Sequence, residues 1–360
     1  MCAAIGMKLK LWSFKMQNSD MDINQVKQIA GSLCGNPEVQ VIPIQGGRNS
    51  GIFRVEVGGE VFALKFFRPD AQRRRDRFDA ETTALELFRD NNVPGVPRIF
   101  VKDREKNCLL MEWIEGLSVD HYDEDGIAAL LMFVRAVYGI SRKPPAGEIR
   151  RATEACLSGV EIIRQIHLRL SRLDPAKQAE PILCDFIDKE FMPVFNEVAE
   201  WSQEGYKRNR WDFMEDIPFE RRTLSLVDIG CHNTLRHGRQ FYFVDFEFFG
   251  WDDPVKLVAD TLQHPGMNLN ARQKQDLLEG FLRIYGSDET FIVRLKLLYA
   301  LFGLKWCMIM LNQFLPGYKP VGVKGVVDNE IQLGRVKNLT WFIRENYQES
   351  SYGTMQFSIR

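Results

Sequence analysis

Two kinds of hydrophobic periodicity divide this chain into an early β-rich part and a later helical part. Up to residue 114, short runs rich in Val, Ile and Phe predict β-strands at 39–44, 51–57, 60–67, 98–103 and 107–114. Gly58 and Gly59 separate the second run from the third, which predicts a hairpin. Helical spacing of apolar residues predicts helices at 24–34 and 76–91. The early part is therefore expected to form a small, mostly antiparallel sheet.

The later part has mostly helical periodicity from Asp123 onward, with two short strands predicted at 233–236 and 241–245. This segregation of strands from helices favours an α+β fold with a small antiparallel β lobe and a large, mainly helical lobe. The predicted parts are an N-terminal extension and helix at 1–37, the small lobe at 38–111, a linker at 112–116 and the large lobe at 117–360.

The composition excludes several classes of protein. The 360 residues include 47 basic and 48 acidic side chains, so global charge gives no reason to expect nucleic acid or a membrane surface as a partner. No apolar run reaches the roughly 18 residues of a membrane-spanning helix. The seven cysteines are scattered without CxxC spacing. They favour reduced thiols in the cytoplasm over a disulfide framework or a zinc site.

The segment 226–254, LVDIGCHNTLRHGRQFYFVDFEFFGWDDP, places acidic residues among phenylalanines and valines. An unpaired carboxylate is costly in such surroundings, so these acids need a compensating partner. Asp228 and Asn233 form a D-x4-N pattern, and Asp245 begins the triplet DFE at the end of a predicted strand. Asp, Asn and a second Asp in this order form the catalytic and metal-binding pattern of kinases.

Three weaker signals precede that segment. Gly46 and Gly47 lie between the predicted strands at 39–44 and 51–57 and suit close approach to phosphate, although they also suit an ordinary turn. Lys65 lies in an apolar strand, where alternation alone favours an outward-facing side chain. Glu81 shares the apolar face of the following helix and needs a cation, for which Lys65 is the nearest candidate. Such a Lys–Glu pair would aim an ammonium group at phosphates.

Taken in chain order, these motifs and the predicted linker follow the kinase template. On these residues, the sequence from about Val39 to His264 resembles the aminoglycoside phosphotransferase and choline kinase-like family, relatives of protein kinases. LLMEWIEG at 109–116 is similar to the interlobe linker of that family, and GWDDPVKLVAD at 250–260 to its Gly-Asp-Pro segment. The resemblance implies a bilobal, protein-kinase-like fold. It also implies that the Glu112 carbonyl and the Ile114 amide bind adenine, with Met111 at the back of the pocket.

The sequence departs from the family pattern in the catalytic loop. Leu226 and Val227 stand where the family has His-Gly before the aspartate. His232 directly precedes Asn233, and a supporting or solvent-facing role is favoured for it over catalysis. Asp252 and Asp253 are interpreted as the start of a helix, because Pro254 would occupy its first turn.

The resulting prediction is an ATP-dependent phosphotransferase that transfers the γ-phosphoryl group to a hydroxyl of a small molecule. Asp228 is the expected catalytic base, and Asn233 and Asp245 are the expected ligands of Mg²⁺. The phosphates of the nucleotide would be bound or positioned by Gly46, Gly47, Lys65 and Glu81. The alternative is a catalytically weak pseudokinase that binds nucleotide and acts through partners. A protein kinase is disfavoured, because Asp245 to Pro254 leaves no room for a long activation segment.

Two local charge clusters leave other questions open. The segment RPDAQRRRDRF at 68–78 favours a solvated loop over a nucleic-acid patch, because acids are interspersed among its arginines. A group of acids at the end of the linker and just after it would suit a polycationic aminoglycoside: Glu115, Asp120, Asp123, Glu124 and Asp125. A sugar or another cell-envelope precursor alcohol is an equally good acceptor on the sequence alone.

Overall fold

The computed structural model describes residues 21–44, 50–68, 76–143, 149–318 and 328–349. Its contacts separate two compact units, residues 1–78 with 99–113 and residues 79–98 with 114–360. The division after Trp113 falls inside the predicted linker. Gly46, Gly47 and most of the arginine-rich segment lie outside the described residues.

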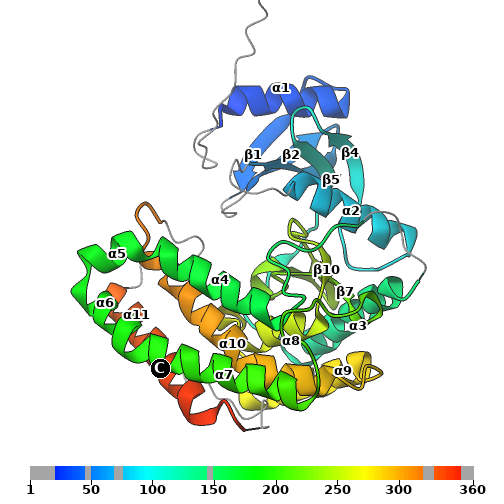
Figure 1. Ribbon diagram of the computed structural model, residues 1–360. Coiled ribbons are helices and arrows are strands. Elements are labelled where there is room, and N and C mark those ends of the chain that lie inside the picture. The colour runs from blue at the N-terminus through cyan, green and yellow to red at the C-terminus, as the bar shows by residue number, and fades with distance from the viewer. Residues whose placement is uncertain (1–20, 45–49, 69–75, 144–148, 319–327, 350–360) are drawn as a thin grey trace, which may run out of the picture. The chain divides into compact units, whose positions relative to one another are not determined.

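The first unit is built on one five-stranded sheet (Figure 1). Every pairing is antiparallel, in the order β1–β2–β3–β5–β4. The strands are β1 (Gln40–Ile44), β2 (Ser50–Val57), β3 (Glu60–Phe67), β4 (Ile99–Asp103) and β5 (Cys108–Glu112). Gly58 and Gly59 form the turn between β2 and β3, both with positive φ, which glycine adopts without a steric penalty. The predicted antiparallel sheet is thus confirmed.

Helix α1 (Ile23–Cys34) packs against one face of this sheet (Figure 1). Asp22 begins the helix by accepting a hydrogen bond from the Asn24 amide at 2.9 Å, and Gly35 ends it in the left-handed conformation. Leu64 and Phe66 of β3 belong to the core beneath α1. Because side chains alternate along a strand, Lys65 lies on the opposite face.

The second unit is mainly helical. Helix α2 (Arg77–Asp90) enters it from the first unit, and the other helices are α3 (Glu124–Ser141), α4 (Gly159–Arg172), α5 (Asp174–Ala179), α6 (Pro181–Phe186), α7 (Met192–Arg208), α8 (Pro254–Gln263), α9 (Ala271–Tyr285), α10 (Phe291–Met310) and α11 (Asn329–Asn346). Helix α10 contacts α4, α7, α8 and α11 and is buried on most sides (Figure 1). A helix that is apolar all round is suited to this central position.

Residues 79–98 group with the helical unit, whereas the sequence assigned them to the small lobe. The physical reason is aromatic packing. The Phe88 ring of α2 makes edge contacts with Phe133, Phe246 and Phe249, with centroid distances of 5.6, 5.1 and 5.5 Å. These contacts tie α2 to the segment that carries the acidic motifs.

Two small sheets interrupt the helices. One joins β6 (Leu117–Ser118), β8 (Thr234–His237) and β9 (Gln240–Phe243), and the other pairs β7 (Thr223–Ser225) with β10 (Gly250–Asp252). The two short strands predicted at 233–236 and 241–245 correspond to β8 and β9, whereas β6, β7 and β10 were not predicted. Among the helices, a π-helical turn at 187–191 lies between α6 and α7.

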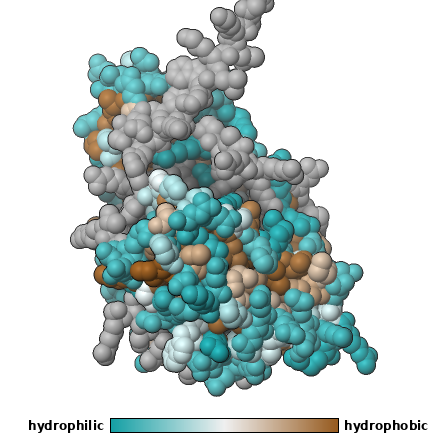
Figure 2. All heavy atoms as spheres, turned by 60° about the vertical axis from the view of Figure 1, so that its left-hand side comes forward, coloured by the Kyte–Doolittle hydropathy of each residue, from teal (hydrophilic) through white to brown (hydrophobic). Residues whose placement is uncertain are grey.

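The face drawn in Figure 2 is mainly hydrophilic, with smaller hydrophobic patches on the helical unit. Large apolar side chains that are exposed include Met132, Ile182, Met214, Ile331 and Trp341. Isolated exposed apolar residues are ordinary on folded domains. Among the described helices, none is both long enough and apolar enough to cross a membrane.

Candidate active site

The loop that carries Asp228 lies between strands β7 and β8. After β7, residues 226–230 lead into a 3₁₀ turn at Cys231–Asn233, which runs directly into β8. The turn is closed by the Asn233 amide, which donates to the Gly230 carbonyl at 3.0 Å. The Asn233 side chain donates from Nδ2 to the Asp228 carbonyl at 3.0 Å. The two ends of the D-x4-N motif are therefore hydrogen-bonded to each other.

The β8–β9 hairpin brings Asp245 to the same end as Asn233. Thr234 is paired with Phe243, and the Val244 amide donates to the Asn233 carbonyl at 3.0 Å. Asp245 follows Val244 directly, so its side chain emerges beside the Asp228 loop. The structure therefore brings Asp228, Asn233 and Asp245 together, as the sequence pattern predicts.

Asp228 and Asp245 both adopt left-handed backbone conformations, with φ of 79° and 68°. Such conformations are uncommon for residues other than glycine, and they cluster at functional sites where the surroundings hold them. Neither conformation follows from the local sequence. Asp228 lies three residues after the end of β7, and Asp245 lies two residues after the end of β9.

Aromatic packing fixes the segment around Asp245. The Phe243 ring stacks on Phe133 of α3, with a centroid distance of 4.5 Å and an interplanar angle of 10°. Phe246 packs against Phe88 of α2. The apolar residues on both sides of Asp245 thus anchor the backbone, and the carboxylate between them is left only half-buried.

The acids at the start of α8 have structural roles. Asp253 is the N-cap, because its Oδ1 accepts a hydrogen bond from the Val255 amide at 2.8 Å, which confirms the predicted helix start. Asp252 is fully buried, and Oδ1 accepts from the Cys156 amide at 2.8 Å. Burial raises the pKa of Asp252 to about 6, although Lys256 at 3.7 Å opposes the shift.

His232 lies against Asp228. Its Nε2 is 3.2 Å from Asp228 Oδ1, and its ring stacks on His264 with a centroid distance of 5.0 Å. Burial opposes a charge on the ring, yet the hydrogen bond and charge of Asp228 raise the pKa of His232. The pKa of His264 falls to about 4 through burial and the nearby His232. Sequence reasoning missed His264 altogether, since it lies 36 residues beyond Asp228.

Two donor sets could be considered for a metal ion. One ligand atom each from Asp228, His232 and His264 lies within 4.8 Å of the other two. The two rings are stacked at 17°, so their lone pairs do not converge, and His264 Nδ1 already accepts from the Gly266 amide at 2.9 Å. Asn233 and Asp245 instead offer oxygen atoms, which are the ligands that Mg²⁺ prefers. These residues fit Mg²⁺, whereas the histidine cluster does not fit a metal.

In the described part of the first unit lie three of the predicted nucleotide-binding residues, Lys65, Met111 and Glu112. Lys65 is paired with Leu109, and Met111 with Ala63, so Lys65 and Met111 lie on the sheet face opposite α1. Lys65 is only 2% exposed, which excludes the outward orientation that strand alternation favours. Glu112 ends β5.

Two further residues predicted to bind the nucleotide, Glu81 and Ile114, belong to the second unit. Glu81 on α2 is only 1% exposed. Ile114 follows the division between the units, and its carbonyl accepts a hydrogen bond from the Gly116 amide at 2.9 Å. The Lys65–Glu81 pair and the adenine contacts stay predictions.

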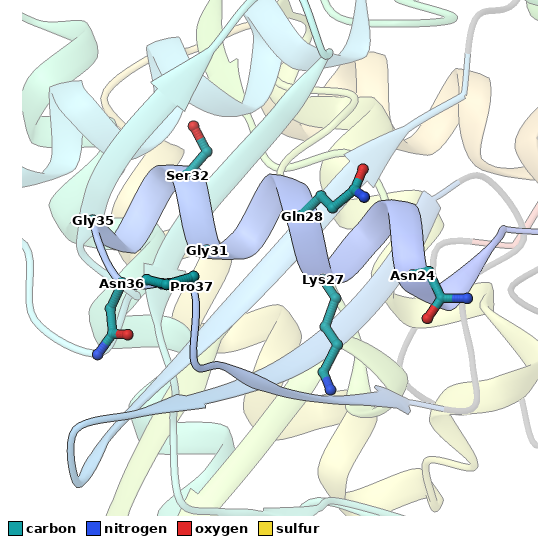
Figure 3. Close-up of a pocket in the computed structure, with 8 residues that line it drawn as sticks. All are labelled: Asn24, Lys27, Gln28, Gly31, Ser32, Gly35, Asn36 and Pro37. Atoms are coloured by element: carbon teal, nitrogen blue, oxygen red, sulfur yellow. The ribbon is translucent and has the colours of Figure 1, made fainter.

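A hollow of about 610 Å³ lies between α1 and residues 35–37. Figure 3 shows that Lys27, Gln28 and Asn36 are among the side chains around it. None of the predicted site residues lines it. It contains no carboxylate, so it cannot supply a general base or a charged magnesium ligand.

Comparison with known families identifies this arrangement. The model of the phosphotransferase enzyme family matches residues 40–291, which is more than half of the chain. The chain belongs to this phosphotransferase family. The predicted family resemblance is thereby confirmed, and so is the prediction of a phosphotransferase. No curated protein matches the chain.

Solved structures share the fold of this phosphotransferase. A choline/ethanolamine kinase family protein from Mesorhizobium loti has a TM-score of 0.62 at 14% identity, over 93% of this chain and 100% of that one. Choline kinase from Cryptosporidium parvum has a TM-score of 0.58 at 11% identity, over 92% and 95%. An amicoumacin kinase in complex with AMP-PNP and Ca²⁺ has a TM-score of 0.58 at 12% identity, over 90% and 94%. The protein-kinase-like α+β fold is thus confirmed.

Proposed function

We propose that this phosphotransferase uses ATP and Mg²⁺ to phosphorylate a hydroxyl group of a small molecule. The observation that carries the proposal is the Asp228–Asn233 hydrogen bond at 3.0 Å, made beside Asp245 at one end of the β8–β9 hairpin. An aspartate base and two oxygen ligands in this relation form the arrangement that phosphoryl transfer requires.

Each residue has a defined part in the proposed reaction. The acceptor oxygen forms a bond to the γ-phosphorus, the bond from that phosphorus to the bridging oxygen of ADP breaks, and Asp228 takes the hydroxyl proton. Asn233 Oδ1 and Asp245 would hold Mg²⁺, because Asn233 Nδ2 is already engaged with the Asp228 carbonyl. The ion would offset negative charge on the phosphates.

The nucleotide would be held mainly by the first unit. Lys65 would contact the phosphates, with Glu81 as its partner and the backbone of Gly46 and Gly47 close to them. Met111 would lie behind adenine, and the Glu112 carbonyl and Ile114 amide would bind its edge. The shared sheet face of Lys65 and Met111 supports this assignment, because one bound nucleotide would span both.

The acceptor is proposed only by class. Neighbouring structures include a spectinomycin phosphotransferase, an ethanolamine kinase and a choline kinase, whose named substrates are small molecules. A sugar or another cell-envelope precursor alcohol is as compatible with this site as an aminoglycoside. We infer a cytoplasmic location, because the six cysteines within the described residues are free thiols.

Phosphoryl transfer from radiolabelled ATP to a panel of sugars, amino alcohols and aminoglycosides tests this proposal. We expect Mg²⁺-dependent labelling of at least one alcohol class, together with slow transfer to water. Binding of Mg-ATP without transfer to water or any alcohol would overturn the proposal. It would favour the pseudokinase alternative, for which the replacement of the loop histidine by Leu226 is the specific observation.

A further inference from the structure

We propose that His232 positions the Asp228 carboxylate for catalysis, in a loop where Leu226 cannot do so. This inference rests on the proposed function, because it assigns a role within the same reaction. Leu226 is 5% exposed and has no side-chain hydrogen-bonding group. His232, six residues later, supplies a ring nitrogen 3.2 Å from Asp228 Oδ1.

The direction of this hydrogen bond is set by the carboxylate. An ionised aspartate only accepts, so His232 Nε2 must carry the proton that lies between the two groups. A hydrogen bond to Oδ1 restrains the rotation of the carboxylate and leaves Oδ2 for the acceptor hydroxyl. The Asn233 side chain fixes the backbone of the same residue through the Asp228 carbonyl.

The loop is shaped around the His232 ring. A Cβ atom on Gly230 would lie 2.9 Å from His232 Cε1 and 3.1 Å from Met267 Sδ. Gly230 has an extended backbone with φ of 179°, so the need for glycine comes from the ring and not from the backbone. The hydrogen atom at Gly230 therefore makes room for the imidazole.

A second ring, at the C-cap of α8, supports His232. His264 stacks on His232 at an interplanar angle of 17° and makes an edge contact with Trp306, with a centroid distance of 4.6 Å. Trp306 is itself held, because its Nε1 donates to Asp260 Oδ1 at 3.0 Å. This chain of contacts restricts the rotation of His232. Among the described residues, Asp228 is the acid that forms a hydrogen bond with the His232 ring.

A purely structural role does not account for this arrangement. The His232 and Asp228 side chains are 40% and 38% exposed, and an exposed pair of this kind contributes little to folding. The His232 ring is ordered and contacts the proposed base, yet it contributes little to stability. Its main effect is therefore on the orientation of the Asp228 carboxylate. Small errors in the orientation of a reacting group have large effects on rate.

The experiment compares His232→Leu, His232→Gln and the control His167→Leu in Mg-ATP turnover with water or an identified alcohol. His167 is exposed on α4 and lies far from the loop in sequence. We expect His232→Leu to lower kcat by roughly 10- to 100-fold, the scale of one hydrogen bond to a charged group. The KM for ATP and the melting temperature should change little. Glutamine retains a donor and should restore a substantial part of kcat.

A double-mutant cycle with Asp228→Asn tests whether His232 acts through Asp228. If it does, His232→Leu costs little further activity once Asp228 is replaced, so the two effects are strongly non-additive. Additive effects, or equal losses in the leucine and glutamine variants, would overturn the proposal. Wild-type protein without any turnover would refute the proposed function instead.

A measurement independent of turnover distinguishes failure of the positioning role from failure of the proposed function. In protein labelled with ¹⁵N-histidine, the His232 ring should show a proton on Nε2 whose resonance shifts in Asp228→Asn but not in His167→Leu. The resonance is assigned by its loss in His232→Gln. A ring protonated only on Nδ1, or one unaffected by Asp228→Asn, would overturn the positioning role whatever the activity.

Discussion

Replacement of Arg294 by methionine should destabilise the helical unit, because Arg294 neutralises a buried aspartate. Its guanidinium bonds to Asp253 and lies 2.7 Å from Asp288 Oδ2. The Arg294 and Asp253 side chains are only 3% and 2% exposed. Asp253 also caps α8, so the pair links the start of α8 to α10.

The expected loss of unfolding free energy is about 3–5 kcal/mol, the usual effect of removing one partner from a buried ion pair. Methionine keeps much of the buried volume, so most of the loss comes from the uncompensated carboxylate. Asp253→Asn in the same chain should recover part of it, because asparagine is neutral and still caps the helix. Arg208→Met is the matched control, since Arg208 is 60% exposed and should cost less than about 0.5 kcal/mol.

The loss should also depend on pH. Burial raises the pKa of Asp253 even with Arg294 present, and removal of Arg294 raises it further. A carboxyl with a folded pKa above its unfolded value favours the native state at low pH, and this contribution disappears as pH rises through the folded pKa. Urea unfolding of Arg294→Met should therefore show a larger deficit at pH 8 than at pH 5. A deficit below about 1 kcal/mol, or one that Asp253→Asn does not reduce, would refute the reasoning.

Three further changes have distinct expected outcomes. Lys65→Ala should remove most of the rise in melting temperature that Mg-ATP causes in wild type, and an undiminished rise would exclude Lys65 from phosphate binding. Asp245→Ala should weaken the Mg²⁺ dependence of nucleotide affinity in calorimetry while the fold persists; an unchanged Mg²⁺ titration would show that the ion binds elsewhere. Gly230→Ala should lower kcat roughly tenfold with little change in melting temperature, because its Cβ displaces His232. Unaltered kcat would mean that the ring moves without consequence.

Most of the fold could be predicted because its elements have strong local patterns. The β2–β3 hairpin carries Gly58 and Gly59 at its turn, and helices such as α4 and α9 have clear apolar periodicity. Strands β7 and β10 have only three residues each, so their pairing depends on contacts between distant segments. Phe88 likewise assigns residues 79–98 to the helical unit through contacts that are distant in sequence.

Motif spacing predicted the main residues of the candidate site, but not the contacts among them. The D-x4-N and DFE motifs identified Asp228, Asn233 and Asp245, and hairpin register accounts for their proximity. The His232–Asp228 contact could not be predicted, because it is set by the conformation of a loop in which Asp228 has a positive φ. The burial of Lys65 was also unpredictable from alternation, since both faces of β3 are covered at that position.

The most direct test of the account is the turnover of Asp228→Asn with Mg-ATP, measured beside its nucleotide affinity. Asparagine is nearly isosteric with aspartate but cannot accept the hydroxyl proton, so its effect should lie in the transition state. We predict that turnover falls by roughly 10²- to 10⁴-fold, the scale of a positioned general base. Affinity for Mg-ATP should change little, because Lys65, Asn233 and Asp245 remain. Undiminished turnover in the purified variant would contradict the account, since Asp228 would then not be the base.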